Sequence, residues 1–273
     1  MGPNNDGQVQ SDAFFLKGDE QSGRYVYCIA AAGEEANLGT IGIEGHRVYP
    51  VVHLDLCALV HDCPPQPYQS AETDVIAAWV LAHHRVVDTA WKRWRSVIPL
   101  TFNTIIVVGE VRSAEENLKA WLEAEYDSLR GKTQILAGKA EYGIKVFRDV
   151  VALAKSITET SLEVKRLEEE IGSKPRGLAY MYRQKLESTV SNEVQRRTGN
   201  EIKELYDELC SCAADIRLEK VKRGEDAGQM LLNLSLLVSP EKYPELEARL
   251  DRIRNRDGYS LRLTGPLPPY SFC

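Results

Sequence analysis

The residue types best suited to bind a metal ion form two short clusters. His83 and His84 are adjacent in an expected helix, where neighbouring side chains point about a quarter-turn apart and cannot easily share one ion. Cys57, His61 and Cys63 form a C-x3-H-x-C group, but the second pair of ligands typical of a zinc site does not follow it. We therefore predict no metal site and no cofactor, with the histidines on a helix face and the cysteines in structural roles.

Catalytic signatures are absent from the sequence. It contains no phosphate-binding loop, no G-x-G-x-x-G after a strand and no G-x-S-x-G turn. Carboxylates are abundant in residues 165–208, but they alternate with lysine and arginine at helical spacing. This pattern is typical of a solvated helix face and not of an acid–base pair. We predict no catalytic residues and no enzymatic activity.

Composition points to a soluble cytoplasmic protein. Of the 273 residues, 43% are hydrophobic and 27% are charged, and the net charge of −6 argues against nucleic acid or an anionic membrane as a partner. No apolar run approaches the ~20 residues that span a bilayer. Residues 1–22 are polar and lack the pattern of a secretory signal, so we expect a flexible lead. The six cysteines are then expected to be reduced thiols.

The segment 23–110 alternates strand and helix signals in the manner of a small α+β domain. A helix is expected from Thr73 or Asp74 to just before Pro99, because apolar residues recur at intervals of three and four. A short hairpin is expected around Glu44-Gly45-His46. The expected strands are 24–31, 40–43, 47–52, 56–61 and 100–108. This order predicts a ferredoxin-like sheet domain.

The segment 111–273 is predicted to be a second, helix-rich α+β domain. Ser113 and Glu116 form a capping box at the start of a helix that extends to about Arg130. Two long, charged helices joined by a short turn predict an antiparallel helical hairpin, with a kink or break in the second helix at Thr198-Gly199. The expected elements are strand 140–148, helices 150–171 and 177–223, strand 230–239, a helix from Pro240 and a final strand from Leu261.

The end of the chain is stiff and aromatic. Leu261 to Thr264 alternates apolar and polar residues as a strand does, and Gly265-Pro266 is expected to stop it. Two prolines and the rings of Tyr270 and Phe272 follow, so we expect this tail to dock on its own domain.

Several motifs together resemble one protein family. Residues 265–272 read GPLPPYSF and are similar to GPWPPYSF, the terminal signature of the gas vesicle GvpF/GvpL family. Residues 25–29 (YVYCI), 98–104 (IPLTFNT) and 138–146 (GKAEYGIKV) resemble further family motifs in the same order, so the likeness spans residues 24–273. The chain departs from the family pattern at Leu267, where tryptophan is usual, and at Thr101 and Asn103, where a basic residue and a glycine are usual.

The resemblance implies a gas vesicle-associated accessory or minor structural protein. Proteins of this family are thought to bind the small hydrophobic shell protein and other accessory proteins, and to help nucleate or assemble the vesicle. We hypothesise that the N-terminal sheet domain binds the shell protein and that the helical hairpin contacts other accessory proteins. The resemblance distinguishes neither the F from the L branch nor a chaperone from a retained shell component.

Partner-interface candidates come from surplus aromatic residues. Trp79 and Trp91 are expected in the core, whereas Trp94, Tyr270 and Phe272 are the interface candidates. The alternative function is a small-ligand-binding regulator or an enzyme built on ferredoxin-like domains. A deep pocket with convergent polar groups would favour this alternative, and a flat apolar patch would favour assembly.

Overall fold

The computed structural model describes residues 22–32, 35–221 and 228–273, so most of the predicted flexible lead lies outside the described residues. The chain divides into two compact units, Met1–Ala90 with Leu100–Arg130 and Trp91–Pro99 with Gly131–Cys273. The domain boundary predicted near residue 110 stays a prediction, because spatial grouping does not test which segments fold independently.

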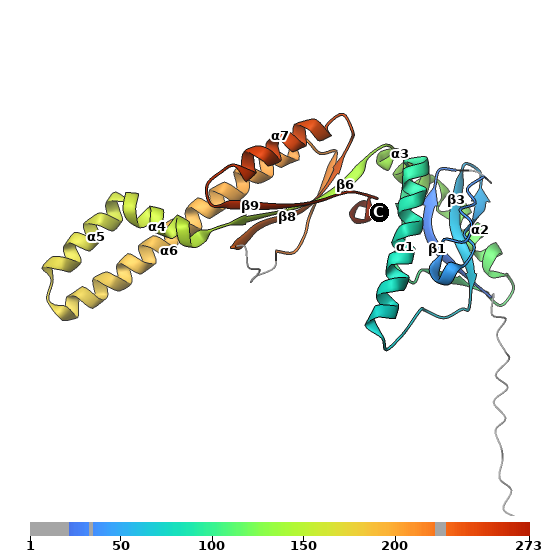
Figure 1. The fold of residues 1–273 in the computed structure, drawn as a ribbon, viewed down its shortest axis with the longest axis horizontal. Helices are drawn as coiled ribbons and strands as arrows, with labels where there is room; N and C mark the ends of the chain where they lie inside the picture. Colours follow the sequence, from blue (N-terminus) through green and yellow to red (C-terminus); the bar gives the residue numbers. More distant parts are fainter. Residues whose placement is uncertain (1–21, 33–34, 222–227) are drawn as a thin grey trace, which may run out of the picture. The chain divides into compact units, whose positions relative to one another are not determined.

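The first sheet has the strand order β2-β3-β1-β4, with β5 also pairing with β1. Its inner strands are nearly continuous apolar runs, because both of their faces are covered. The pairs β1–β3 and β2–β3 are antiparallel, and this order is that of a ferredoxin-like sheet. The strands are β1 (Gly23–Ala30), β2 (Tyr49–His53), β3 (Leu56–Cys63), β4 (Val97–Pro99) and β5 (Ile105–Val107) (Figure 1).

Among the described residues, one helix lies between β3 and β4 along the chain, and two more follow β5. The helix α1 (Thr73–Trp94) has the predicted start, and the capping box of Ser113 and Glu116 begins α2 (Ala114–Ala124). The Ser113 side chain accepts from the Glu116 backbone N–H while the Glu116 carboxylate accepts from the Ser113 backbone N–H, as predicted. The predicted single helix is divided at Glu125 and continues as α3 (Tyr126–Leu136).

The hairpin predicted around Glu44–His46 is present only as a single antiparallel bridge between Gly39 and Val48. The strand expected at 40–43 is wrong, because residues Ile43–Gly45 form a short 3-10 turn, η1, and the longer hairpin is made by β2 and β3. The cause is a buried hydroxyl: Tyr27 Oη accepts the backbone N–H of Ile43 at 2.9 Å and holds the turn against β1. The tight link between β2 and β3 places Leu54 at a φ of 55°.

The second sheet is antiparallel, with the order β7-β8-β6-β9. Side chains of β6 alternate between its faces: Tyr142 stacks on Tyr243 of α7 with ring centroids 5.0 Å apart, so Glu141 points to the opposite face. The elements are β6 (Ala140–Arg148), β7 (Asp215–Leu218), β8 (Gln229–Val238), α7 (Tyr243–Arg254) and β9 (Tyr259–Leu267). The helix predicted over 177–223 is wrong at its end, where Asp215–Leu218 form β7.

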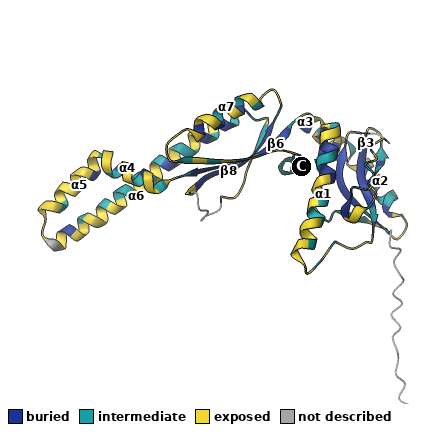
Figure 2. Cartoon of the chain, in the orientation of Figure 1, coloured by how far each residue is buried: buried dark blue, intermediate teal, exposed yellow. Residues whose placement is uncertain are grey.

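The helical hairpin inserted between β6 and β7 is present. Its first arm is two helices, α4 (Val150–Thr160) and α5 (Leu162–Ser173), because Ser161 caps a new helix by accepting the Val164 N–H. Its second arm, α6 (Arg176–Cys210), passes through Thr198-Gly199 without the predicted break and ends before residue 211. Leu153, Ile157 and Val164 form a narrow buried core against α6, and most other hairpin residues are exposed (Figure 2).

A partly buried ion pair fastens α6 to the second sheet. Arg148 on β6 lies 3.3 Å from the Glu201 carboxylate, and their side chains are 12% and 22% exposed. The Arg148 guanidinium also covers the Tyr259 ring at 4.5 Å and donates to the Asp257 carbonyl. Removing one partner leaves the other charge desolvated and unpaired, which is more costly than the loss of a surface pair.

We expect Glu201→Ala to lower the free energy of unfolding by about 2–3 kcal/mol, because it leaves the Arg148 charge unpaired and removes the hydrogen-bond partner of the Tyr259 hydroxyl. Glu204→Ala is the matched control on the exposed face of the same helix and is expected to cost less than about 0.5 kcal/mol. Urea unfolding followed by circular dichroism measures both. Equal losses in the two variants would show that the ion pair contributes nothing beyond helix propensity.

Candidate functional site

A buried tyrosine–histidine pair connects β1 to α1 in the first unit. His83 Nε2 lies 3.1 Å from the Leu100 carbonyl, which can only accept, so Nε2 carries the proton. In the neutral ring, Nδ1 then accepts from the Tyr25 hydroxyl at 2.9 Å, and that hydroxyl accepts the backbone N–H of Asn103 at 3.1 Å. Every polar atom of the pair is therefore satisfied while Tyr25 and His83 are almost wholly buried.

A second chain of the same kind begins at Tyr27. Its hydroxyl accepts from Ile43 N–H, so its own proton goes to Nδ1 of His61 at 2.8 Å. His61 Nε2 then donates to the Tyr68 hydroxyl at 3.0 Å. The His46 ring stacks on His61, with centroids 4.8 Å apart. Through these hydrogen bonds, β1 and β3 hold Tyr68 and thereby position the loop after β3.

The electrostatics of the two chains favour structure over acid–base chemistry. Burial, with a smaller contribution from His46, lowers the pKa of His61 from 6.5 to about 3. Burial, with a smaller contribution from His84, lowers the pKa of His83 to about 4. Burial also raises the pKa of both Tyr25 and Tyr27. At neutral pH these groups are uncharged and fully hydrogen-bonded, so they neither take up nor release protons readily.

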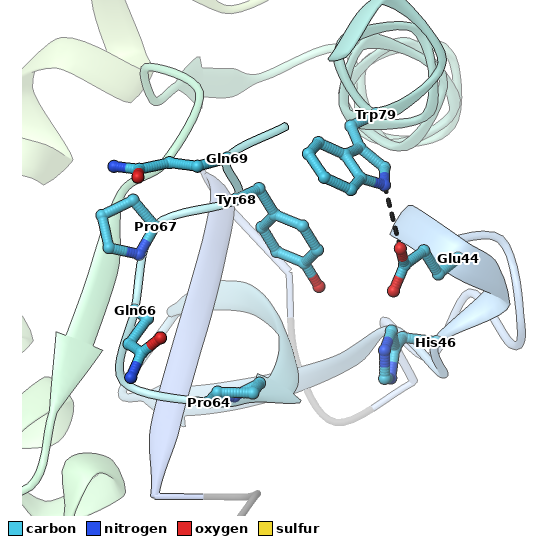
Figure 3. A pocket seen from close by; sticks show the side chains of 8 residues that line it. All are labelled: Glu44, His46, Pro64, Gln66, Pro67, Tyr68, Gln69 and Trp79. Carbon is cyan, nitrogen blue, oxygen red and sulfur yellow. Dashed lines mark hydrogen bonds between the residues drawn. The ribbon is translucent and has the colours of Figure 1, made fainter. Parts of the chain in front are cut away.

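An open pocket of about 410 Å³ lies at the outer end of the second chain (Figure 3). The rings of Tyr68 and Trp79 meet edge to face at 5.2 Å, and Trp79 Nε1 donates to Glu44 Oε1 at 3.0 Å. Asn103 holds Tyr68 in place, since its side-chain amide bonds both the Tyr68 N–H and the Tyr68 carbonyl. The lining residues are Glu44, His46, Pro64, Gln66, Pro67, Tyr68, Gln69 and Trp79.

The structure gives the suspected metal ligands other partners. His61 is occupied by the two tyrosines, and His83 by Tyr25 and Leu100. Cys57 and Cys63 are buried in the first sheet, where burial raises the pKa of their thiols to about 12 and about 11. Within residues 22–32, 35–221 and 228–273 no group of three or more His, Cys, Asp or Glu side chains is placed to hold a metal ion.

The C-terminal tail docks on its own unit, as predicted. Glu141 of β6 is only 7% exposed, and its carboxylate accepts from the Ser271 backbone N–H at 2.8 Å and the Ser271 hydroxyl at 2.6 Å. The Arg217 guanidinium covers the Phe272 ring at 5.6 Å. The short turn η2 (Tyr270–Phe272) therefore packs on the sheet face opposite α7.

The predicted stop at Gly265-Pro266 is wrong, because β9 continues to Leu267. The strand passes this point through an irregularity in its pairing with β6 between Glu141 and Gly143. Gly265 has a φ of 126°, and a Cβ there would lie 2.8 Å from the Glu141 carbonyl oxygen. Only glycine fits this close approach without strain.

The three interface candidates lie in two elements of the second unit. Trp94 is half-buried near the end of α1, with the Arg93 guanidinium 5.0 Å from its ring. Tyr270 and Phe272 are half-buried in η2. Trp91 is in the core as predicted, whereas Trp79 is half-exposed in the pocket. Whether any of them binds a partner stays a prediction.

Apolar surface is exposed in two places. Val107, Val108 and Val111 at and after the end of β5 are 45%, 50% and 93% exposed. On the hairpin, a groove of about 640 Å³ between α4 and α6 has a mainly apolar lining that includes Val150, Ala154, Leu186, Val190 and Val194. Such patches mark interaction surfaces more often than single exposed side chains do.

Comparison with known proteins assigns the family. The family described as "Gas vesicle synthesis protein GvpL/GvpF" matches residues 23–273. The chain belongs to the GvpL/GvpF family. It is 28% identical over 246 residues to gas vesicle protein L of Haloferax mediterranei, covering 85% of this chain and 72% of that protein. It is 25% identical over 259 residues to gas vesicle protein L1 of Halobacterium salinarum, covering 92% and 90%.

The fold of this GvpL/GvpF protein also matches a solved structure. The crystal structure of the gas vesicle protein GvpF from Anabaena sp. PCC7120 aligns with a TM-score of 0.71 at 20% identity, covering 92% of this chain and 98% of that one. The family resemblance and the α+β fold predicted from sequence are thus confirmed. None of the helices in the described part of the chain has the length and apolarity needed to cross a membrane.

Sequence reasoning missed two groups of residues in this GvpL/GvpF chain. Glu44 was predicted only as a turn residue, and no site was predicted at Tyr68, because hydrogen bonds of Tyr27 and His61 from distant strands bring these residues to Trp79. Glu141 and Ser271 lie within two of the family-like motifs, but their hydrogen bond joins residues 130 positions apart, so no local sequence pattern predicts it.

The buried histidines predict that stability falls in mild acid. The unfolded chain binds a proton on His83 near pH 6.5 and the folded chain only near pH 4, so the free energy of unfolding decreases as the pH falls through this window. The slope from one such histidine is about 1.4 kcal/mol per pH unit. We expect His83→Gln to flatten the pH dependence of urea unfolding between these values by about this amount.

His84→Gln is the matched control, since His84 is the adjacent, exposed residue of the same helix. It removes only the smaller cause of the lowered His83 pKa and should change the pH dependence of stability much less than His83→Gln does. If the two variants showed the same slope, His83 would not be held neutral by the fold.

Proposed function

We propose that this protein binds the small hydrophobic gas vesicle shell protein in the cytoplasm and helps nucleate or assemble the vesicle. The observation that carries the proposal is the match of the GvpL/GvpF family over residues 23–273. A shell monomer that polymerises through apolar faces must be kept soluble before it is added, and a protein that covers such a face does this by removing it from water. The protein acts by binding and not by catalysis.

The first unit supplies the surface for the shell protein. Val107, Val108 and Val111 present apolar side chains at the end of an edge of the first sheet, where β5 pairs only with β1 among the described strands. Burying apolar surface contributes about 25 cal/mol per Å², so three valines add several kilocalories per mole to an interface.

The hairpin groove supplies the surface for other accessory proteins. Its apolar lining follows one face of α4 and α6, which suits an amphipathic helix of a partner. Leu162, Tyr180 and Met181 are 76%, 62% and 67% exposed elsewhere on the hairpin and extend the apolar surface available there. The two classes of partner thus bind different parts of the chain.

The test is co-purification of tagged protein with the shell protein through a high-salt wash. We expect the unmodified protein to retain the shell protein, because apolar contacts persist in salt. The triple variant Val107→Ser/Val108→Ser/Val111→Ser should retain at least about tenfold less, because each 1.4 kcal/mol of lost interface energy weakens binding by a factor of ten. Leu218→Ser, which changes a 69% exposed leucine of β7, is the matched control and should retain the full amount.

Trp94→Ala, Tyr270→Ala and Phe272→Ala test the interface predicted from sequence in the same assay. We choose point variants because deletion of residues 265–273 would remove Ser271 and leave the buried Glu141 carboxylate without these two hydrogen bonds. Folding of each variant is checked by circular dichroism. A folded, unmodified protein that retained no shell protein would contradict direct binding and make another accessory protein the first partner.

A further inference from the structure

The pocket between η1, α1 and the loop after β3 is not used by the proposed function. Buried hydrogen bonds fix the shape of this pocket. Tyr27 holds Ile43, the neighbour of Glu44, and His61 holds Tyr68, so two of the pocket's walls are anchored in the first sheet. The pocket's aromatic and acidic lining is a different chemistry from the exposed valines and from the hairpin groove.

Glu44 occupies an unusual backbone position. Its φ of 53° and ψ of 23° are left-handed values that glycine or asparagine adopts more easily, and Gly45 follows with a φ of 77°. A glutamate in this conformation costs roughly 1 kcal/mol, so the side chain has to contribute something that glycine would not. One contribution is visible, since Glu44 Oε1 accepts from Trp79 Nε1.

That tether uses one oxygen of an exposed carboxylate, whose negative charge stays available to a cationic ligand. Among the described residues no lysine or arginine forms an ion pair with Glu44, and none lines the pocket. Figure 3 shows Glu44 and His46 on one side of the pocket, with the Tyr68 ring beside Trp79. The site therefore offers a carboxylate together with two electron-rich rings.

A carboxylate beside tyrosine and tryptophan rings is the arrangement that recognises an organic cation. The ring faces attract positive charge, and the carboxylate accepts charge-assisted hydrogen bonds from it. Arginine suits this site better than lysine does, because its planar guanidinium stacks on a ring and donates sideways at the same time.

The surroundings favour an arginine that is part of a polypeptide. Pro64, Gln66, Pro67 and Gln69 line the pocket from an exposed segment without regular structure, and a glutamine amide can both donate to a peptide carbonyl and accept from a peptide N–H. The volume of about 410 Å³ also exceeds what a single guanidinium fills. We propose that this pocket binds an arginine side chain presented by an extended segment of a partner polypeptide, with Glu44 as the charge partner and Tyr68 and Trp79 as the stacking surface.

The test follows the Trp79 indole N–H in the full ¹⁵N-labelled chain, with its signal assigned through Trp79→Phe. The probe is the capped peptide Ac-Gly-Ser-Arg-Pro-Ser-NH₂, and its partner probe carries citrulline, a neutral isostere, in place of arginine. We expect a saturable shift with the arginine peptide and about tenfold weaker binding of the citrulline peptide. Equal binding of the two peptides would overturn the proposal.

Glu44→Gln separates charge recognition from the structural tether. Its side-chain carbonyl still accepts from Trp79, so the indole signal of the free protein should stay near its place, while affinity for the arginine peptide falls about tenfold. Glu123→Gln, on the exposed face of α2, is the matched control and should bind as the unmodified chain does. Unchanged affinity in Glu44→Gln would remove Glu44 from the site.

The source of the arginine is tested with N-acetylarginine amide, which carries the same guanidinium without a neighbouring chain. Weaker binding of this compound than of the peptide supports a polypeptide occupant. Equal affinity would show that the flanking chain contributes nothing and would overturn the assignment to a partner segment. This test involves no shell protein, so its outcome is independent of the co-purification result.

Discussion

The order of the first unit depends on satisfying two tyrosine hydroxyls that β1 buries. Tyr25 and Tyr27 are fully buried. A buried hydroxyl without a hydrogen bond would cancel much of the stabilising free energy gained by burying the tyrosine ring. Each hydroxyl accepts a backbone N–H from a distant loop and donates to a histidine. One strand thereby fixes the positions of the loop at Ile43, the loop at Asn103 and the loop at Tyr68, whose own hydrogen bonds reach only a few residues along the chain.

Glu141 has the corresponding role in the second unit. A carboxylate that is 7% exposed requires donors, and Ser271 provides two of them from the far end of the chain. The terminal GPLPPYSF motif is thus explained by folding: Gly265 passes close to Glu141, and the stiff Pro268-Pro269 segment delivers Ser271 to the carboxylate. A departure from the family pattern also has a physical reason. Asn103, where glycine is usual, has a φ of 69°, which asparagine tolerates, and its amide clamps Tyr68.

Local signals made much of this fold predictable. The strand Ala140–Arg148 and the capping box at Ser113 were correct because alternation and capping act over a few residues. The strand expected at 40–43 was wrong because a hydroxyl on another strand holds Ile43 in a 3-10 turn. The division of one helix at Ser161 was missed because a serine cap inside an amphipathic run looks like an ordinary polar position. β7 was missed because its residues follow a long helix and join the sheet only through β8.

The pocket was beyond sequence reasoning for the same reason: its carboxylate and its rings come from three segments that only tertiary hydrogen bonds bring together. Its chemistry also complements the exposed valines. Apolar contacts are strong but have no direction, so they hold a partner without fixing its orientation. The contact of a guanidinium with a carboxylate and two rings is directional, because a misplaced guanidinium loses its hydrogen bonds and with them binding free energy. The proposed function, presentation of polymerising subunits in register, needs both kinds of contact. Both proposed sites belong to the first unit, and the buried Tyr27–His61–Tyr68 chain holds the pocket of the directional one in place.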